Sequence, residues 1–149
     1  MSSIQNKLPT IARYLLGLAF FVFGLNGFLH FLPQPPMSGP PANFAMAMVA
    51  TGYLFPLVKG TEVIVSLLLL SNRFVPLALT LLAPVMVNIV AFHAFLAPSG
   101  LALPIVLLIA HLYLARSYRA AFSPMLQARN APQMNPPASG RPRVPATAS

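Results

Sequence analysis

Four long apolar runs divide the chain, and polar side chains within them are few. The runs occupy residues 14–32, 53–70, 74–95 and 101–118. A helix needs roughly 20 apolar residues to cross a bilayer. The fourth run reaches a spanning length only if arginines at its end extend toward the headgroups. The pattern therefore predicts an all-α fold, a membrane-spanning four-helix bundle formed by residues 1–122.

Two other segments do not have the pattern of a span. Residues 42–51 are rich in Met and Ala and follow a proline-rich turn, so we expect a short helix at the outer face between the first two spans. Residues 123–149 are rich in Pro, Ala and Gln with scattered Arg. Such a composition cannot bury a core, and we expect a disordered basic cytoplasmic tail.

The overall composition agrees with a membrane protein. Hydrophobic residues make up 57% of the chain and charged residues 7%, whereas a soluble domain carries about 25% charged residues. The net charge of +8 comes from only nine basic residues, which form no dense patch, so we exclude nucleic acid as a partner. The chain has no cysteine, which excludes disulfides and thiolate metal sites.

The basic residues alternate between the two sides of the membrane. Lys7 and Arg13 precede the first run, Arg73 follows the second, and several arginines follow the fourth, while the other two connections have none. The positive-inside rule then places both termini in the cytoplasm, and this requires an even number of spans. The first run is too long for a signal peptide and lacks a cleavage site, so we interpret it as an uncleaved span.

Polar residues inside the runs are the candidates for function because they are costly in lipid. At about 1.5 Å of rise per residue, Asn26 lies roughly 9 Å, Glu62 roughly 13 Å and Asn88 roughly 10 Å below the outer ends of their helices. Three helices thus bring a polar group to a similar depth. We therefore predict a polar ligand-binding pocket in the outer half of the membrane, lined by Asn26, His30, Lys59, Glu62 and Asn88.

Helical spacing indicates which side chains share a face. Asn26 and His30 are four residues apart, and Gly17 and Gly24 lie on the opposite face, where close helix packing is expected. Lys59 can pair with Glu62, the only acidic residue in the chain.

The third run cannot aim all of its polar side chains at one site. Asn88 and His93 point about 140° apart on a straight helix, and we favour Asn88 for the interior. The alternative for the asparagines is that they hold helices together by hydrogen bonds. For His30 and His93 the alternative is a position at the membrane interface, and for His111 it is that of a hydrogen-bonded histidine in the core.

Catalytic motifs are absent from the sequence. A single carboxylate excludes a two-carboxylate mechanism, and no nucleotide or flavin fingerprint is present. The three histidines lie on three different runs, so we assign neither a metal site nor catalytic residues. If the protein is redox-active, we expect this only as part of a complex.

The chain resembles the DoxX-like family of small bacterial membrane proteins over about residues 11–123. The similarity is in Arg13–Leu18 with Phe23–Gly27, in Lys59–Val63, and in Ala83–His93. The resemblance implies a four-helix bundle in the bacterial inner membrane, with links to quinone-coupled oxidation. His111 departs from the pattern, since related chains often carry an acidic residue there.

These observations lead to one functional hypothesis and two alternatives. The hypothesis is an accessory subunit of a membrane redox system that binds quinone, or another small lipophile, in the outer-half pocket. The alternatives are a small-solute transporter or channel, for which Ser66, Thr80 and His111 would continue a polar track inward, and a structural partner protein without ligand. Expected partners are membrane lipids and either redox-complex subunits or further copies of the chain.

Overall fold

The computed structural model describes residues 7–33, 36–126 and 128, and these residues are mainly helical, with no strand among them. Six α-helices and two short 3₁₀ helices occur among the described residues. They are α2 (Leu8–Leu29), α3 (Pro40–Ala50), α4 (Leu54–Leu70), α5 (Val75–Phe95), η1 (Pro98–Gly100), α6 (Ala102–Ser117), α7 (Arg119–Phe122) and η2 (Ser123–Leu126).

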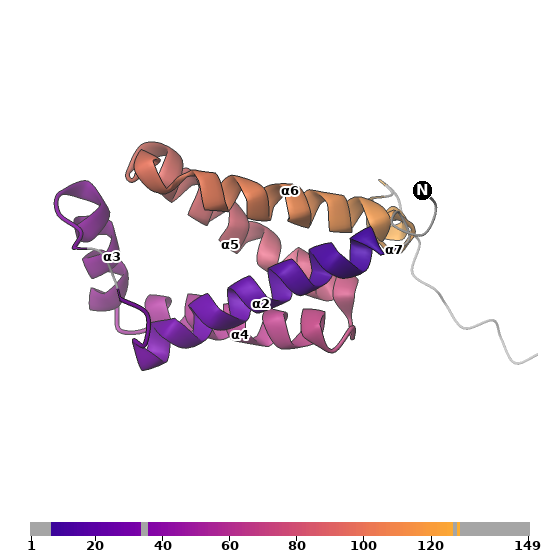
Figure 1. Cartoon of the computed structure of the whole chain (residues 1–149), viewed down its shortest axis with the longest axis horizontal. Coiled ribbons are helices and arrows are strands. Elements are labelled where there is room, and N and C mark those ends of the chain that lie inside the picture. Colours follow the sequence, from indigo (N-terminus) through magenta and orange to yellow (C-terminus); the bar gives the residue numbers. More distant parts are fainter. Residues whose placement is uncertain (1–6, 34–35, 127, 129–149) are drawn as a thin grey trace, which may run out of the picture.

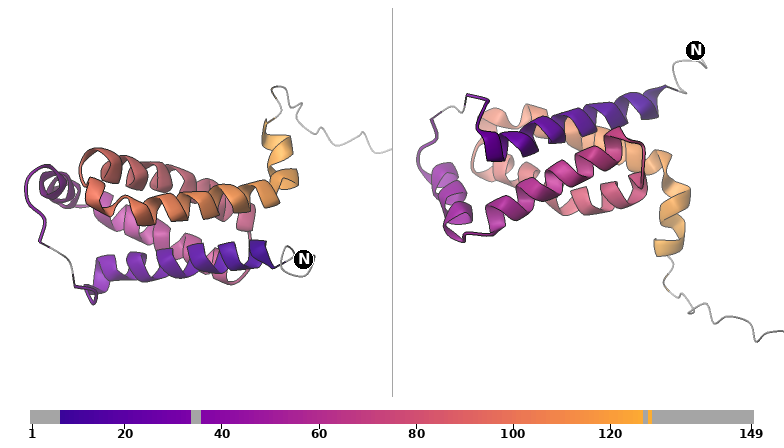
Figure 2. Two further views of the ribbon diagram at one scale, coloured as in Figure 1. Left: turned by 45° about the horizontal axis from the view of Figure 1, so that its top comes forward. Right: turned by 90° about the horizontal axis from the view of Figure 1, so that it is seen from below.

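The four longest helices lie alongside one another (Figure 1). Helix α2 packs against α4 and α6, and α5 packs against the same two helices. One end of the molecule holds the beginning of α2, the end of α6 and the helix α7 that follows it in the chain. Helix α3 lies at the other end (Figure 2). Helix α3 and the connection 96–101 between α5 and α6 therefore lie at the same end of the molecule.

Length and composition make α2 and α5 suitable for crossing a membrane. Helices α4 and α6 have 17 and 16 residues, near or below the usual minimum. Each pairs with a neighbour across a sharp bend, α3 with α4 at 91° and α6 with the Arg119–Leu126 segment at 74°. The described chain thus offers two membrane-spanning helices, or up to four if each bent pair is one span, which points to a membrane protein.

The predicted elements correspond closely to the helices, with one large shift. Helix α2 begins at Leu8 rather than at residue 14, with a proline in its first turn, where the missing N–H costs nothing. The helix expected at residues 42–51 is α3, and its flanking residues Gly39 and Gly52 have φ of +67° and +75°, which favours glycine. The tail expected from residue 123 starts as the helical turn η2, and most of it lies outside the described residues.

The interior is tightest toward the beginning of α2. Side chains from all four long helices are completely buried there, namely Leu16, Leu69, Leu82 and Leu114. Large apolar side chains such as Leu18, Ile64, Val87 and Ile109 point outward and are more than half exposed. Helices that are apolar on all faces are typical of a lipid environment.

Glycines let α2 and α4 approach closely. A Cβ atom at Gly17 would lie 2.8 Å from Leu70 Cδ2, and one at Gly24 would lie 2.9 Å from Val63 Cγ2 and 3.1 Å from the Val63 nitrogen. The expected close packing at Gly17 and Gly24 is therefore confirmed. Gly27 extends it, since its Cβ would lie 2.5 Å from Lys59 Cδ.

Arg13 is buried, which the sequence analysis did not anticipate. Interpreting it as a loop charge before the first span was wrong, because α2 begins earlier and carries Arg13 inside the assembly. Its Nη1 donates hydrogen bonds to the carbonyl oxygens of Leu69 and, at 3.2 Å, Leu70. Those carbonyls end α4, and that of Leu69 also accepts the backbone N–H of Asn72 at 3.2 Å, so Arg13 adds a side-chain cap to α4 from a neighbouring helix.

Candidate functional site

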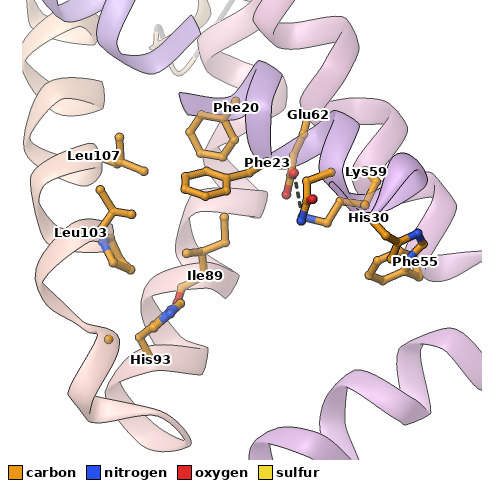
Figure 3. A pocket seen from close by; sticks show the side chains of 14 residues that line it. Phe20, Phe23, His30, Phe55, Lys59, Glu62, Ile89, His93, Leu103 and Leu107 are labelled. Carbon is orange, nitrogen blue, oxygen red and sulfur yellow. Dashed lines mark hydrogen bonds and ion pairs between the residues drawn. The ribbon is translucent and has the colours of Figure 1, made fainter. Parts of the chain in front are cut away.

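A cavity of about 520 Å³ opens among the four long helices at the α3 end of the molecule (Figure 3). Small-molecule sites commonly have this size and a mainly apolar lining with a few polar groups. The lining here follows that pattern. It consists of Phe20, Phe23, Asn26, Gly27, His30, Phe55, Lys59, Glu62, Ile89, His93, Gly100, Leu103, Pro104 and Leu107.

The charged group of the cavity is the pair formed by Lys59 and Glu62 on α4. Lys59 Nζ donates to Glu62 Oε2 at 2.8 Å, as expected for residues three apart. The Glu62 side chain is 2% exposed and the Lys59 side chain 22%, so the ammonium group is the more open partner. A buried ion pair is a weak source of stability, so its place in a cavity wall favours a role in binding.

Asn26 lies in the cavity wall and also shapes the end of α2. Its Oδ1 accepts a hydrogen bond from the backbone N–H of Leu32 at 2.7 Å, and its backbone carbonyl accepts one from His30 at 2.9 Å. These bonds hold the residues that follow α2. The side chain is buried, and within the described chain its Nδ2 has no hydrogen-bond partner, which leaves its N–H groups for the cavity.

His30 stands at the rim of the cavity. It follows the last residue of α2 in the left-handed conformation, with φ of +52°, and its side chain is exposed. Figure 3 shows it beside Phe55, close to the Lys59 side chain. The residue therefore borders the cavity and lies at the end of the helix, and its position at the membrane interface stays a prediction.

Asn88 does not belong to the cavity, and the preference for it over His93 was wrong. Asn88 is exposed, whereas His93 and Ile89 line the cavity. The buried stripe of α5 runs through Leu82 and Met86, and helical spacing continues it to Ile89 and His93. Asn88 lies off this stripe, so a helix that packs its apolar side inward must turn Asn88 outward.

The apolar lining was missed by sequence reasoning that looked only at polar residues. Phe20 and Phe23 lie between the Lys59–Glu62 pair and the α5–α6 wall (Figure 3). Leu103 and Leu107 from α6 complete that far wall. Their spacing of three and four residues was visible in the sequence, but it is common to every core-facing helix and does not distinguish a cavity from a filled core.

Further polar groups lie deeper in the interior without reaching the cavity. Ser66 is fully buried and donates to the Val63 carbonyl at 2.6 Å. His111 is 6% exposed, and its Nδ1 has no hydrogen-bond partner among the described residues, so it is not the satisfied core histidine expected. Thr80, expected to continue a polar track, is exposed on α5. No cluster of three or more metal-ligating side chains occurs in the described part of the chain.

Comparisons with known proteins give no further assignment. No family model, curated protein or solved structure matches the chain. The chemistry of the site therefore carries the functional argument. The cavity combines aromatic and aliphatic walls with an ammonium group, a carboxylate, an amide and imidazoles, which suits an apolar molecule with one or more polar ends.

Proposed function

We propose that this protein is a DoxX-like accessory subunit of a membrane redox system and binds a quinone or a similar small lipophile in the cavity. The observation that carries the proposal is the Lys59–Glu62 pair in the wall of a cavity that is otherwise mainly apolar. Lys59 and Asn26 would donate hydrogen bonds to the polar head, and Glu62 would hold Lys59 in place. The aromatic side chains would contact the ring of the ligand.

Thermal stabilisation of the purified protein by ubiquinone and menaquinone analogues tests this function. A ligand that binds only the folded state raises its free energy of unfolding with the logarithm of the ligand concentration relative to Kd. We expect an upward shift of Tm for the wild type and a much smaller one for Glu62→Gln and Lys59→Met. Asn88→Ala is the matched control, because it removes a polar group from α5 outside the cavity and should keep the full shift.

Copurification is the test of the accessory role. Mass spectrometry of lipids and proteins retained in mild detergent should find a quinone and redox-complex subunits with the wild type. Glu62→Gln should lose the quinone and keep the protein partners. A wild-type sample that retains no quinone, together with no Tm shift from any analogue, would rule out the proposed ligand.

We also propose four crossings of the bacterial inner membrane with both termini in the cytoplasm. The alternation of the loop charges, which without Arg13 rests on Lys7, Arg73 and the arginines after α6, and the start of α2 at the same end of the molecule as α7 support this topology. The cysteine-free chain allows a direct test with single cysteines at Ser38, Ser71 and Ser99. An impermeant maleimide should label Ser38→Cys and Ser99→Cys in intact cells, and Ser71→Cys only after the cells are opened.

Transport is the second candidate, and buried Ser66 and His111 are the observations in its favour. The Ser66 hydroxyl is already bonded to its own helix, and Thr80 is turned outward, so no continuous polar path leads from the cavity to the other end of the described chain. Solute flux into liposomes decides between the two functions. Flux that His111→Leu abolishes would favour transport over ligand binding.

A further inference from the structure

The His93 ring is fixed in the cavity wall by three contacts. Its Nδ1 lies 2.8 Å from the carbonyl oxygen of Ile89, one turn earlier in α5. Phe92 contacts the ring edge to face, with 5.2 Å between centroids. The Cδ2 side of the ring faces Gly100 in η1, where an added Cβ would lie only 2.9 Å from Cδ2. A side chain held on three sides is preorganised for recognition, because little rotamer freedom is lost when a ligand binds.

The bond to Ile89 also sets the chemistry that His93 offers. A carbonyl oxygen can only accept, so Nδ1 carries the proton, and in the neutral ring Nε2 is left as a hydrogen-bond acceptor. Nε2 has no partner within the described residues. A Cβ at position 100 would lie 3.3 Å from Nε2 and 2.9 Å from Cδ2. Glycine at this position therefore keeps the space beside Nε2 open.

The wall formed by α2 and α4 offers hydrogen-bond donors, whereas His93 offers an acceptor. Lys59 and Asn26 bring N–H donors into the cavity from α4 and α2, and one carboxylate oxygen of Glu62 is occupied by Lys59. Figure 3 shows the ion pair and His93 on opposite sides of the cavity. A molecule that spans the cavity thus meets the N–H donors of Lys59 and Asn26, with the second Glu62 oxygen, at one end and the single acceptor of His93 at the other.

We propose that His93 and Gly100 form a subsite for a hydroxyl or N–H group, so that the cavity selects an apolar ring compound with a carbonyl at one end and a hydroxyl at the other. The inference rests on the proposed function in one respect, that the cavity binds a small lipophile. It adds the specificity of that binding: His93 Nε2 accepts from the hydroxyl, while Lys59 and Asn26 donate to the carbonyl.

A pair of probes that differ in one group tests the subsite. A long-chain 4-hydroxyphenyl ketone and its methyl ether share the ring, chain and carbonyl, and only the first can donate to Nε2. We expect wild-type protein in nanodiscs to bind the hydroxyl probe about tenfold more tightly, the value of one hydrogen bond. His93→Phe should bring the two affinities together, and Lys59→Met should weaken both probes by a similar factor.

Two further variants keep the test decisive if His93→Phe folds poorly. Gly100→Ala leaves His93 in place but crowds Nε2, and it should also remove the preference. His93→Gln keeps an acceptor and should retain part of it. Equal wild-type affinities, or a preference that survives both His93→Phe and Gly100→Ala, would overturn the subsite alone. Binding of neither probe and of no quinone analogue would overturn the proposed function with it.

Discussion

Arg13 and Lys59 are both basic side chains at the contact between α2 and α4, yet they lie at opposite ends of it and have different surroundings. Arg13 is 7% exposed, and its guanidinium is occupied by the carbonyls that end α4. The Lys59 side chain is 22% exposed, borders a cavity, and has one carboxylate partner. The end around Arg13 is closely packed, whereas the end around Lys59 is hollow.

The difference separates a structural charge from a candidate functional one. Buried backbone carbonyls at a helix end need hydrogen-bond donors whatever the protein binds, so the role of Arg13 is structural. Glu62 and Lys59 satisfy only each other and could be replaced by apolar residues without leaving backbone groups unpaired. Retaining such a pair beside a cavity is best explained by what the cavity binds. Four predictions test this distinction.

The largest effect is expected for Arg13→Met. The carbonyls of Leu69 and Leu70 would lose a charged donor, and we expect the free energy of unfolding to fall by about 2–3 kcal/mol. Ligand-induced stabilisation should stay at the wild-type value, because Arg13 is not part of the cavity. Equilibrium unfolding in mixed detergent micelles measures the first effect and the Tm shift the second. If the folded variant lost the ligand-induced Tm shift, Arg13 would not have the purely structural role that separates it from Lys59.

Gly24→Ala should destabilise the contact between α2 and α4, since the new Cβ meets the α4 backbone. Overpacking of this kind typically costs about 1–3 kcal/mol. Gly60→Ala is the matched control, because it lies in α4 with no atom within 4 Å of its Cβ position. We expect the control to gain about 0.5–1 kcal/mol from the better helix propensity of alanine. Effects of the same sign in both variants would contradict the close packing.

A double-mutant cycle with Lys59→Met and Glu62→Gln should give a coupling energy of about 1 kcal/mol, within the usual range for contacting pairs. Each single variant leaves one polar group without its partner, whereas the double variant leaves neither charged. The double variant should therefore be more stable than the sum of the singles predicts, and it should still fail to bind the ligand. Additive effects would show that the ion pair does not form in the membrane.

The smallest effect on stability is expected for His111→Leu. The substitution removes a buried nitrogen without a partner in the described chain, and such replacements are near neutral or stabilising by up to about 1 kcal/mol. Ligand binding should be unchanged, because His111 does not line the cavity. A large loss of binding or of flux would assign His111 a function that the geometry of the cavity does not give it.

Local rules predicted the helices well and the site only in part. Pro40, Pro76 and the long apolar runs determine where helices begin, so the predicted ranges correspond to α2 to α6. The paired spacing of Lys59 and Glu62 likewise follows from one helix turn. Depth along the membrane brought Asn26 and Glu62 together correctly, since both line the cavity. It placed Asn88 wrongly, because depth does not determine which face of a helix points inward.

The hydrophobic pattern and the loop charges predict a helical membrane protein and the order of its helices, because both depend on the transfer of single residues between water and lipid. Only the tertiary structure decided that Arg13 caps α4, that His93 and not Asn88 lines the cavity, and that Gly100 leaves His93 accessible. These features arise from contacts between helices. In a chain whose helices are apolar on nearly every face, periodicity alone does not define the inward face.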